Sequence, residues 1–256
     1  DIYVNDAFSC SHRKQASIHQ VAKFANKSFA GPLLENEIKA INMVLSKKKG
    51  PVTCIIGGSK ISTKINIISN LMKNVDKIII VGAMANNFLV YDGFNIGKSL
   101  IEKNSNNIIK QIYLNVKNLS CEIIIPKDFN VSESFESEGS IKKIGNIYDN
   151  EIILDIGPET IGKIEDVIDA SSTVLWNGPA GYFENENFSK GTLAIAKKIS
   201  ENTLNKSLIS ILGGGDTISA INKNKTKLNF THLSTAGGAF LEYLEGKDLP
   251  GISVLK

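Results

Sequence analysis

The segment Ile55–Lys64 reads IIGGSKISTK and predicts a turn between a buried strand and a helix. Two further junctions are built in the same way, LWNGPAGYFE at residues 175–184 and ILGGGDT at residues 211–217. Each apolar run bends through glycines, which let backbone N–H groups come close to an anion. After the first and third, a helix-like pattern adds unpaired donors and a favourable dipole. Three such junctions in one chain indicate a nucleotide-handling α/β enzyme.

Strand-like apolar runs alternate with helical patterns along the chain. The runs are short, β-branched and nearly continuous in apolar character, as is typical of strands buried on both faces. The predicted strands are Pro51–Ile56, Lys77–Val81, Cys121–Ile125, Thr173–Trp176 and Leu208–Leu212. The predicted helices are Ser62–Lys73, Asn104–Lys117, Glu159–Ala170, Phe188–Ser200 and Thr217–Lys223. The alternation predicts an α/β fold with a doubly wound, mostly parallel sheet of Rossmann type, in which ligands bind at the carboxyl ends of the strands.

Two regions depart from this alternation. Residues 126–155 mix short apolar patches with Glu, Ser, Gly and Asn, and we expect a hairpin or an excursion on the flank of the sheet. Leu34–Leu45 has apolar residues at helical spacing between two Gly-Pro pairs, which indicates an isolated helix connecting two domains. The Lys47–Lys49 triplet suits the carboxyl end of that helix better than a binding patch. The chain opens in strand-like residues without a methionine, so we expect the native N-terminus to lie upstream of Asp1.

Composition excludes several classes of protein. Of 256 residues, 42% are apolar, which suffices for one large or two modest domains. A net charge of +3 is too small to suggest nucleic-acid binding. The three cysteines are far apart and contain no Cys-x-x-Cys pair, so they resemble reduced cytosolic thiols rather than a disulfide or zinc framework. No apolar run approaches the ~20 residues that span a bilayer, and we expect a soluble cytoplasmic protein.

Lys60 and Lys64 are the candidate catalytic cations of the first junction. Four residues apart at the start of the predicted helix, they are expected on one helix face, directed toward the strand ends. Two ammonium groups there would neutralise charge that develops on a transferring phosphoryl group. The alternative is a pair of solvated surface lysines. The spacing is not that of a Walker A loop.

The other two junctions carry carboxylates. Asp216 follows the glycines of the third junction, where a magnesium–nucleotide complex needs an oxygen ligand. The alternative, compatible with the first, is that Asp216 caps the following helix. Glu184, after the turn of the second junction, is suited to accept hydrogen bonds from ribose hydroxyls, whereas Trp176 is expected in the core.

His12 and Arg13 form a further candidate pair. Arg13 is the only arginine of the chain, and it follows the strand-like segment Tyr3–Phe8. An arginine that persists among lysines suggests a need for planar, bidentate anion recognition. The three histidines show no metal-ligand spacing, and there is no Gly-x-Ser-x-Gly elbow, so hydrolase chemistry is not favoured.

Taken together, these motifs resemble the phosphoglycerate kinase family over essentially the whole chain. Tyr3–Phe8 with His12-Arg13 is similar to the family's late substrate-domain strand, and Gly31–Glu35 to the start of its interdomain helix. The motifs that follow in the family's order are Gly57–Lys60, Ser62–Lys64, Met84–Asn86, Asp155–Pro158, Trp176–Pro179 and Gly213–Thr217. The family has three glycines after Thr235, and the first of them is Ala236 here, so a Cβ is expected where the backbone approaches phosphate.

The resemblance implies reversible phosphoryl transfer between 1,3-bisphosphoglycerate and ADP with Mg²⁺, giving 3-phosphoglycerate and ATP in glycolysis. It also implies a domain division: residues 1–33 as the remnant of a substrate domain, 34–49 as the interdomain helix, 50–235 as the nucleotide-binding domain and 236–256 as a helix and tail that return to the first domain. The protein would be a monomer without nucleic-acid or membrane partners.

The resemblance assigns a role to each motif residue. Lys64, with Lys60 beside it, would contact the moving phosphoryl group, and the helix that begins at Gly237 and Gly238 would face the reaction centre. His12 and Arg13 would bind 3-phosphoglycerate. The nucleotide, besides Lys64, would contact Gly82 and Gly157 at the adenine, Glu184 at the ribose, and Asn177, Gly214, Gly215, Asp216 and Thr217 toward the phosphates and magnesium.

A second reading remains open. The chain could be a stand-alone or degenerate module that binds ADP or ATP without catalysis. In-frame coding sequence upstream of Asp1, of roughly one domain's length, would favour the kinase.

Overall fold

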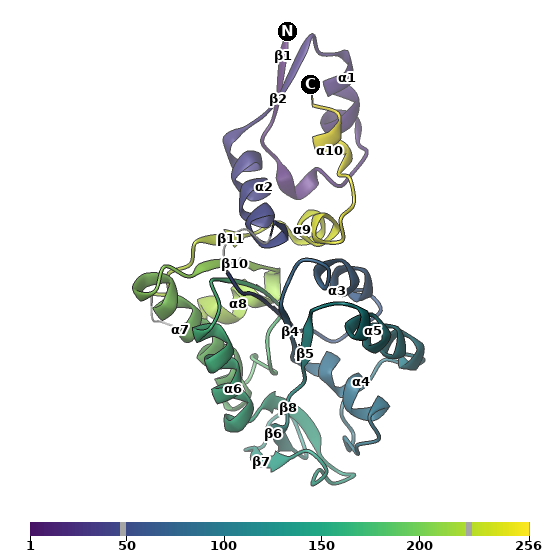
Figure 1. The fold of residues 1–256 in the computed structure, drawn as a ribbon, viewed down its shortest axis with the longest axis vertical. Helices are drawn as coiled ribbons and strands as arrows, with labels where there is room; N and C mark the ends of the chain where they lie inside the picture. Colours follow the sequence, from purple (N-terminus) through teal and green to yellow (C-terminus); the bar gives the residue numbers. More distant parts are fainter. Residues whose placement is uncertain (47–49, 224–226, 256) are drawn as a thin grey trace.

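The computed structural model describes residues 1–46, 50–223 and 227–255 and is centred on a six-stranded sheet (Figure 1). Every neighbouring pair of its strands is parallel. In spatial order the strands are β11 (His232–Ser234), β10 (Ile209–Gly213), β9 (Thr173–Asn177), β3 (Val52–Ile56), β4 (Lys77–Ile80) and β5 (Glu122–Ile124). Five of the six lie where apolar runs predict them; β11 was not predicted.

Helices cover both faces of this sheet because the strand side chains alternate between two cores. Cys54 and Ile56 face one core, with α2 (Pro32–Leu45), α3 (Ile65–Leu71), α4 (Ala83–Tyr91), α5 (Asn106–Asn118) and α9 (Gly237–Leu244). Ile55 and Trp176 face the other, with α6 (Pro158–Asp169), α7 (Lys190–Asn205) and α8 (Gly215–Asn222). Trp176 is fully buried, as expected for a core residue. The doubly wound α/β fold is therefore confirmed.

The strand order reverses between β3 and β9. The chain proceeds from β3 to β4 and β5 on one side, then returns to β9, β10 and β11 on the other. Gly57 N donates to Asn177 O at 2.8 Å just beyond these two strand ends. A reversal of this kind leaves a crevice outside the carboxyl ends of the strands, where ligands of α/β proteins bind.

A second, antiparallel sheet occupies the region expected to be an excursion. Its strands are β7 (Ser140–Lys143), β6 (Asp128–Ser132) and β8 (Ile152–Ile156), in that spatial order. A register irregularity between Asn130 and Val131 interrupts the β6–β8 pairing. The excursion is thus a three-stranded sheet, and β8 ends beside the crevice.

The N-terminal block is a smaller unit built around a parallel pair, β1 (Ile2–Asn5) and β2 (Lys27–Ala30). Between them lie a 3₁₀ turn (Phe8–Cys10), a π turn (Ala16–Gln20) and α1 (Val21–Phe24). The C-terminal α10 (Pro250–Ser253) packs into this block, far from the six-stranded sheet (Figure 1).

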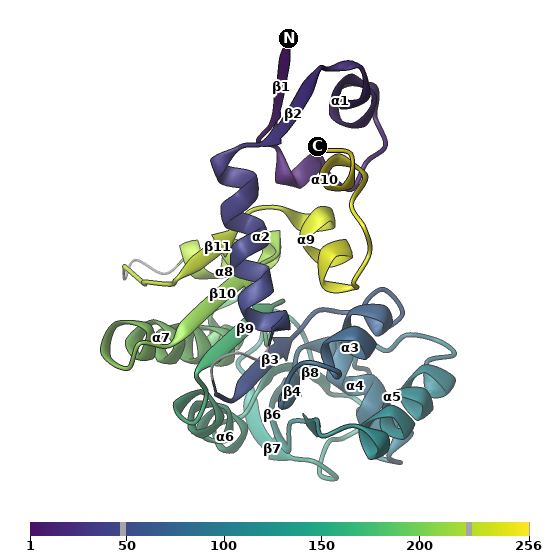
Figure 2. The ribbon, with the colours of Figure 1, turned by 45° about the horizontal axis from the view of Figure 1, so that its top comes forward.

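Helix α2 runs from the N-terminal block to the six-stranded sheet (Figure 2). It begins at Pro32, earlier than the predicted residue 34, because proline at the first position suits a helix and Asp6 Oδ1 accepts from Leu34 N at 2.9 Å. It ends at Leu45; the expected extension to residue 49, including the Lys47–Lys49 triplet, falls partly outside the described residues.

One face of the β1–β2 pair exposes three apolar side chains beside Lys27. Ile2, Val4 and Phe29 share this face by strand register and are 67%, 54% and 46% exposed. The opposite face buries Asn5 and Ser28 against the block.

Candidate functional site

Three glycines allow the first and second junctions to meet backbone to backbone. Gly178 has φ +101°, and a Cβ there would lie 2.5 Å from the carbonyl group of Gly57. A Cβ at Gly57 would in turn lie 2.2 Å from Pro179 O. Gly82, at φ +66°, completes the contact from the end of β4. Only glycine fits these positions, so the floor of the crevice is fixed by three strand ends at once.

Lys64 reaches from the first junction to the second. Its Nζ donates to Gly57 O at 2.7 Å and to Asn177 Oδ1 at 2.6 Å. Burial lowers the pKa of Lys64 to about 8, against the opposing attraction of Asp216. The amino group is therefore a partly desolvated cation, placed where an incoming anion would be strongly attracted.

The expected pairing of Lys60 with Lys64 on one helix face is wrong. Helix α3 begins only at Ile65, so neither lysine is on it. Residues 61–64 form a bend and a turn instead, because Thr63 Oγ1 donates to Lys60 O at 2.9 Å and Ser62 N donates to the Glu102 carboxylate at 3.0 Å. Lys60 is exposed and its charge acts on Glu102, whose pKa is lowered chiefly by its hydrogen bonds from Ser62. The alternative of a surface lysine holds for Lys60 but not for Lys64.

The third junction adds a glycine with positive φ and a buried hydroxyl. Gly214, at φ +100°, precedes the first residue of α8, and a Cβ there would lie 2.8 Å from Asn177 Nδ2. Thr217 is fully buried and its Oγ1 accepts from Gly178 N at 2.7 Å. Asn177 Nδ2 donates to Gly213 O at 2.8 Å. These contacts join all three junctions into one structure.

Asp216 lies in the first turn of α8 and is exposed toward the cavity. It does not cap the helix: the cap residue is Gly214, and no side chain supplies the cap hydrogen bond. Residues 1–46, 50–223 and 227–255 contain no group of three or more His, Cys, Asp or Glu that could hold a metal. Magnesium is commonly held by one or two carboxylates together with substrate phosphates. A single carboxylate at a glycine-lined phosphate cradle fits that mode of binding.

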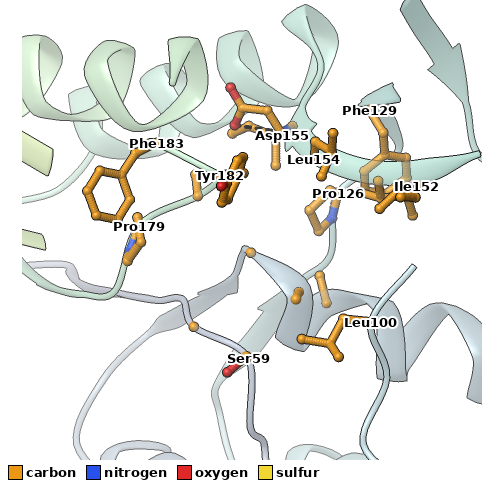
Figure 3. A pocket seen from close by; sticks show the side chains of 18 of the residues that line it. Ser59, Leu100, Pro126, Phe129, Ile152, Leu154, Asp155, Pro179, Tyr182 and Phe183 are labelled. Carbon is orange, nitrogen blue, oxygen red and sulfur yellow. Dashed lines mark hydrogen bonds between the residues drawn. The ribbon is translucent and has the colours of Figure 1, made fainter. Parts of the chain in front are cut away.

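A cavity of about 430 Å³ opens at this edge of the sheet (Figure 3). It contains backbone from all three junctions at one end and apolar side chains of the β6–β8 sheet at the other. Of the residues predicted as nucleotide-binding, Gly82, Glu184 and Asp216 line it. The other predicted residues do not line it: Lys64, Asn177, Gly157, Gly214, Gly215 and Thr217. A Cβ at Gly157 would lie 2.2 Å from Asp128 Oδ2, a carboxylate that accepts from the first backbone amides of α6.

The apolar end of the cavity is bounded by an aromatic pair. The rings of Phe135 and Tyr182 are edge to face, with centroids 5.0 Å apart. Asn185 Nδ2 donates to Phe135 O at 2.7 Å, so the loop after β6 is attached to the turn after β9. Figure 3 shows Tyr182 beside Asp155, with Pro126 and Phe129 further along the same wall.

The structure brings His12 close to the start of α9. A Cβ at Gly238 would lie 3.0 Å from His12 Nε2, and His12 Nδ1 is buried without a hydrogen-bond partner. Arg13 is exposed beside it. Gly237 has open space around its Cα, whereas Ala236 is buried in the core, so the expected intrusion of its Cβ toward the site does not occur.

Sequence reasoning missed several residues that line the cavity. Phe135 comes from a segment without a binding motif, and Lys98 comes from Gly97-Lys98-Ser99, whose sequence favours a surface turn; only the fold brings them to the site. Asp155 was noted only as part of a motif, although a charged residue within the apolar run of β8 is itself a signal. Burial raises the pKa of Asp155 to about 7, partly offset by hydrogen bonds from backbone amides.

Fold and site together define a doubly wound α/β protein with a cavity at the reversal of strand order, bordered by glycine junctions that Lys64 connects. The family model "Phosphoglycerate kinase" matches residues 1–247. The chain belongs to the phosphoglycerate kinase family.

Known relatives support the assignment over almost all of the chain. A phosphoglycerate kinase of Wolbachia pipientis subsp. Culex pipiens is 43% identical over 98% of this chain, and one of Chelativorans sp. is 42% identical over 100%. The solved structure of phosphoglycerate kinase from Coxiella burnetii matches with a TM-score of 0.94 at 40% identity, covering 99% of this chain and 65% of that one. The structure from Pyrococcus horikoshii matches with a TM-score of 0.79 at 30% identity, covering 100% and 64%. The chain spans 64% and 65% of the length of those two curated relatives.

No helix formed by the described residues is long and apolar enough to cross a membrane.

Proposed function

We propose that this chain is the nucleotide-binding, C-terminal portion of a phosphoglycerate kinase. The complete enzyme would transfer a phosphoryl group reversibly between 1,3-bisphosphoglycerate and ADP, giving 3-phosphoglycerate and ATP in glycolysis. The observation that carries the proposal is the position of Lys64, whose ammonium group joins two glycine junctions at the strand reversal. Preorganised donors at such a site act on charge that develops in the transition state.

The nucleotide phosphates would lie at the junctions. The backbone of Gly214 and Gly215, with Thr217 and Asn177 beneath it, would orient the phosphates, and Lys64 would contact the moving phosphoryl group. Asp216 would hold Mg²⁺, which supplies neutralisation of phosphate charge when bound. The ribose would contact Glu184, and the base would enter the apolar end of the cavity that Gly82 borders, with Gly157 behind it.

The protein's own contribution is mainly geometry and electrostatics. Phosphoryl transfer needs the acceptor, the phosphoryl group and the leaving oxygen in line, and such positioning can be worth ~7–11 kcal/mol. Lys64 Nζ donates short hydrogen bonds to Gly57 O and Asn177 Oδ1 and a long one, at 3.5 Å, to Asn177 O. The N–H bond that makes the long contact is the one expected to turn to phosphate. The pKa of Lys64 is lowered in the chain without ligand, and a phosphate bound beside it would stabilise the protonated form.

The triose substrate would bind on the other side of the crevice. His12 and Arg13 would contact 3-phosphoglycerate, and the amide end of α9 at Gly237 and Gly238 would face the reaction centre. Residues 1–33 would then belong to a substrate domain, 34–49 to the connecting helix, 50–235 to the nucleotide domain and 236–256 to the returning tail. Lys60 would add only long-range positive charge. We further propose a cytoplasmic monomer without nucleic-acid or membrane partners.

Two assays test this proposal. Calorimetric titration of the chain with Mg-ADP should show binding, and a coupled assay of the same chain should show no measurable phosphoryl transfer. The full-length protein should show both Mg-ADP binding and phosphoryl transfer. Absence of ADP binding to the chain would refute the nucleotide site, and robust turnover by the chain alone would refute the division of the active site between two domains.

A second candidate is a non-catalytic module that binds ADP or ATP. It is favoured by the exposed position of Arg13. A full-length gene product that binds ADP but has no activity would support this candidate.

A further inference from the structure

Asp155 is a buried carboxylate in the wall of the cavity. It lies near the end of β8, its side chain is 2% exposed, and it is a neighbour of Tyr182 (Figure 3). Its oxygens are held by backbone amides: Oδ2 accepts from Gly191 N at 2.8 Å and Oδ1 accepts from Ile156 N at 2.9 Å. Burying a charged carboxylate costs free energy, which hydrogen bonds such as these two must offset.

Two glycines from separate segments press against the same carboxylate. A Cβ at Gly181 would lie 2.4 Å from Asp155 Oδ1, and a Cβ at Gly191 would lie 2.5 Å from the same atom. Gly181 belongs to the turn after β9, and Gly191 to the first turn of α7. Asp155 is therefore the point at which β8, the turn and the amide end of α7 meet.

The turn held at this point carries the residues that face the cavity. Tyr182 N donates to Leu154 O at 2.7 Å, so a backbone hydrogen bond attaches the turn to β8 beside Asp155. Tyr182, Phe183 and Glu184 follow in sequence, and all three line the cavity. A shift of Gly181 away from Asp155 would displace all three together.

We propose that Asp155 is a positioning residue for the nucleoside end of the site: its carboxylate, bound by amides of β8 and α7, is the surface on which Gly181 packs, so that Tyr182, Phe183 and Glu184 are arranged to bind base and ribose. This inference rests on the proposed nucleotide-binding function and adds a residue to it that does not itself touch the phosphates.

The ionisation of Asp155 gives this role a distinctive signature. Burial raises its pKa to about 7, opposed by the amides of Gly191 and Ile156 and by Lys190 on α7. The charged carboxylate accepts from both amides, whereas in the protonated form one of its two oxygens presents an O–H donor to the amide that faces it. Nucleoside affinity should therefore fall as the pH falls through 7.

Other charged groups face the same cavity and must be separated from Asp155. Lys98, Glu184 and Asp216 line the cavity, and Lys64, with a pKa of about 8, lies at the phosphate end. Adenosine carries no phosphate, so it reports the nucleoside end without the titration of Lys64. Tripolyphosphate reports the phosphate end alone.

The experiment measures binding of both probes by calorimetry or ligand-observed NMR, one pH unit below and one unit above the pKa of Asp155. For the wild-type chain, adenosine should bind up to about tenfold more weakly at the lower pH. Asp155→Asn should weaken adenosine binding at the higher pH and abolish the pH dependence, while tripolyphosphate binding remains. Gly181→Ala should weaken adenosine binding without weakening tripolyphosphate binding. Asp76→Asn is the matched control, because Asp76 also accepts from a backbone amide, that of Val52 at the opposite end of β3.

A flat wild-type profile for adenosine would overturn the inference, and this measurement needs no variant to fold. If Asp155→Asn kept the wild-type pH dependence of adenosine affinity, the inference would be overturned as well. An equal loss of affinity for both probes in folded Asp155→Asn would also overturn it. Failure of the wild-type chain to bind either probe would instead refute the proposed nucleotide site, and the inference with it.

Discussion

Lys64 Nζ and Asn177 Oδ1 lie 2.6 Å apart, although 113 residues separate them in the chain. Asn177 also donates from Nδ2 to Gly213 O, so one amide side chain connects the ends of β3, β9 and β10. The lysine is thereby placed before any ligand arrives, and little reorganisation is needed when phosphate binds.

Lys64→Ala in the full-length protein should lower kcat far more than it raises the nucleotide KM. Charge on the moving phosphoryl group is greatest in the transition state, so a loss of ~2.7–4 kcal/mol is expected, as for other preorganised donors. Steady-state kinetics of both variants would test this, with exposed Lys60→Ala as the control. A change in KM with intact kcat would make Lys64 a ground-state binding residue only.

Binding of Mg-ADP near pH 8 should take up protons. Burial lowers the pKa of Lys64 to about 8 in the chain without ligand, and a phosphate beside the ammonium group would raise it again. About half of the Lys64 population would then gain a proton at that pH, so uptake of roughly 0.5 proton is the upper limit. Calorimetry in two buffers of different ionisation enthalpy measures this uptake. Lys64→Met should abolish it, and uptake that persists in this variant would assign it to another group.

Arg13→Lys in the full-length protein should weaken 3-phosphoglycerate binding and leave ADP affinity almost unchanged. Guanidinium can bind a carboxylate or phosphate in bidentate fashion, which an ammonium group cannot reproduce. Titration of both ligands against wild type and variant would decide it. Unchanged affinity for 3-phosphoglycerate would show that Arg13 lies outside the substrate site.

Gly178→Ala should destabilise the fold by at least about 2 kcal/mol. A side chain at φ +101° is strained, and its Cβ would overlap the backbone of Gly57. Gly162→Ala is the matched control, because Gly162 lies within α6 with open space around its Cα, and alanine there should stabilise by up to about 1 kcal/mol. Urea unfolding measures both variants. Equal stability of Gly178→Ala and wild type would contradict the close contact of the two junctions.

Asp155→Asn should become more stable relative to wild type as the pH rises from 4 to above 7. In the folded chain the pKa of Asp155 is raised from 3.8 to about 7, so the folded chain binds the proton more tightly than the unfolded chain does. The stability that protonated Asp155 contributes to wild type is fully present below the pKa of the unfolded chain. It is lost as the pH rises through the pKa of Asp155 in the folded chain. Asparagine does not titrate and loses nothing over this window. Thermal unfolding across the range should show the two curves diverge; parallel curves would place the pKa of Asp155 near its ordinary value.

The strands and most helices were predictable because burial on both faces leaves continuous apolar runs. Val52–Ile56 and Thr173–Asn177 are entirely buried, and this is visible in the sequence. The glycine junctions were equally visible, since a turn that closes backbone to backbone tolerates no Cβ. The short strands β2 and β11 and helices α1 and α10 were not, because three or four residues carry no periodicity. Helix α4 was not predicted either, because its residues Met84–Leu89 are buried without interruption and show no helical alternation.

The side-chain geometry of the site was less predictable. Lys60 and Lys64 have the spacing of a helix face, but hydrogen bonds of Ser62 to Glu102, which lies 40 residues further on, hold that segment in turns. Phe135 and Tyr182 meet only because the loop after β6 is attached to the turn after β9. Contacts of this kind depend on tertiary placement and leave no local signal.

The closure of the N-terminal block by α10 has a consequence for synthesis on the ribosome. Asn5 Nδ2 donates to Gly251 O at 2.8 Å, and Gly251 N donates to Ser11 O at 2.8 Å. Residues 1–33 thus complete their contacts only after some 246 further residues have been made, which takes roughly 10 to 50 s at ~5–20 residues/s. Until then the block is expected to remain open to proteases and chaperones while the six-stranded sheet folds ahead of it. Limited proteolysis of ribosome-bound chains that end before Leu249 should cut within residues 1–33, and chains that extend beyond Lys256 through the exit tunnel should resist.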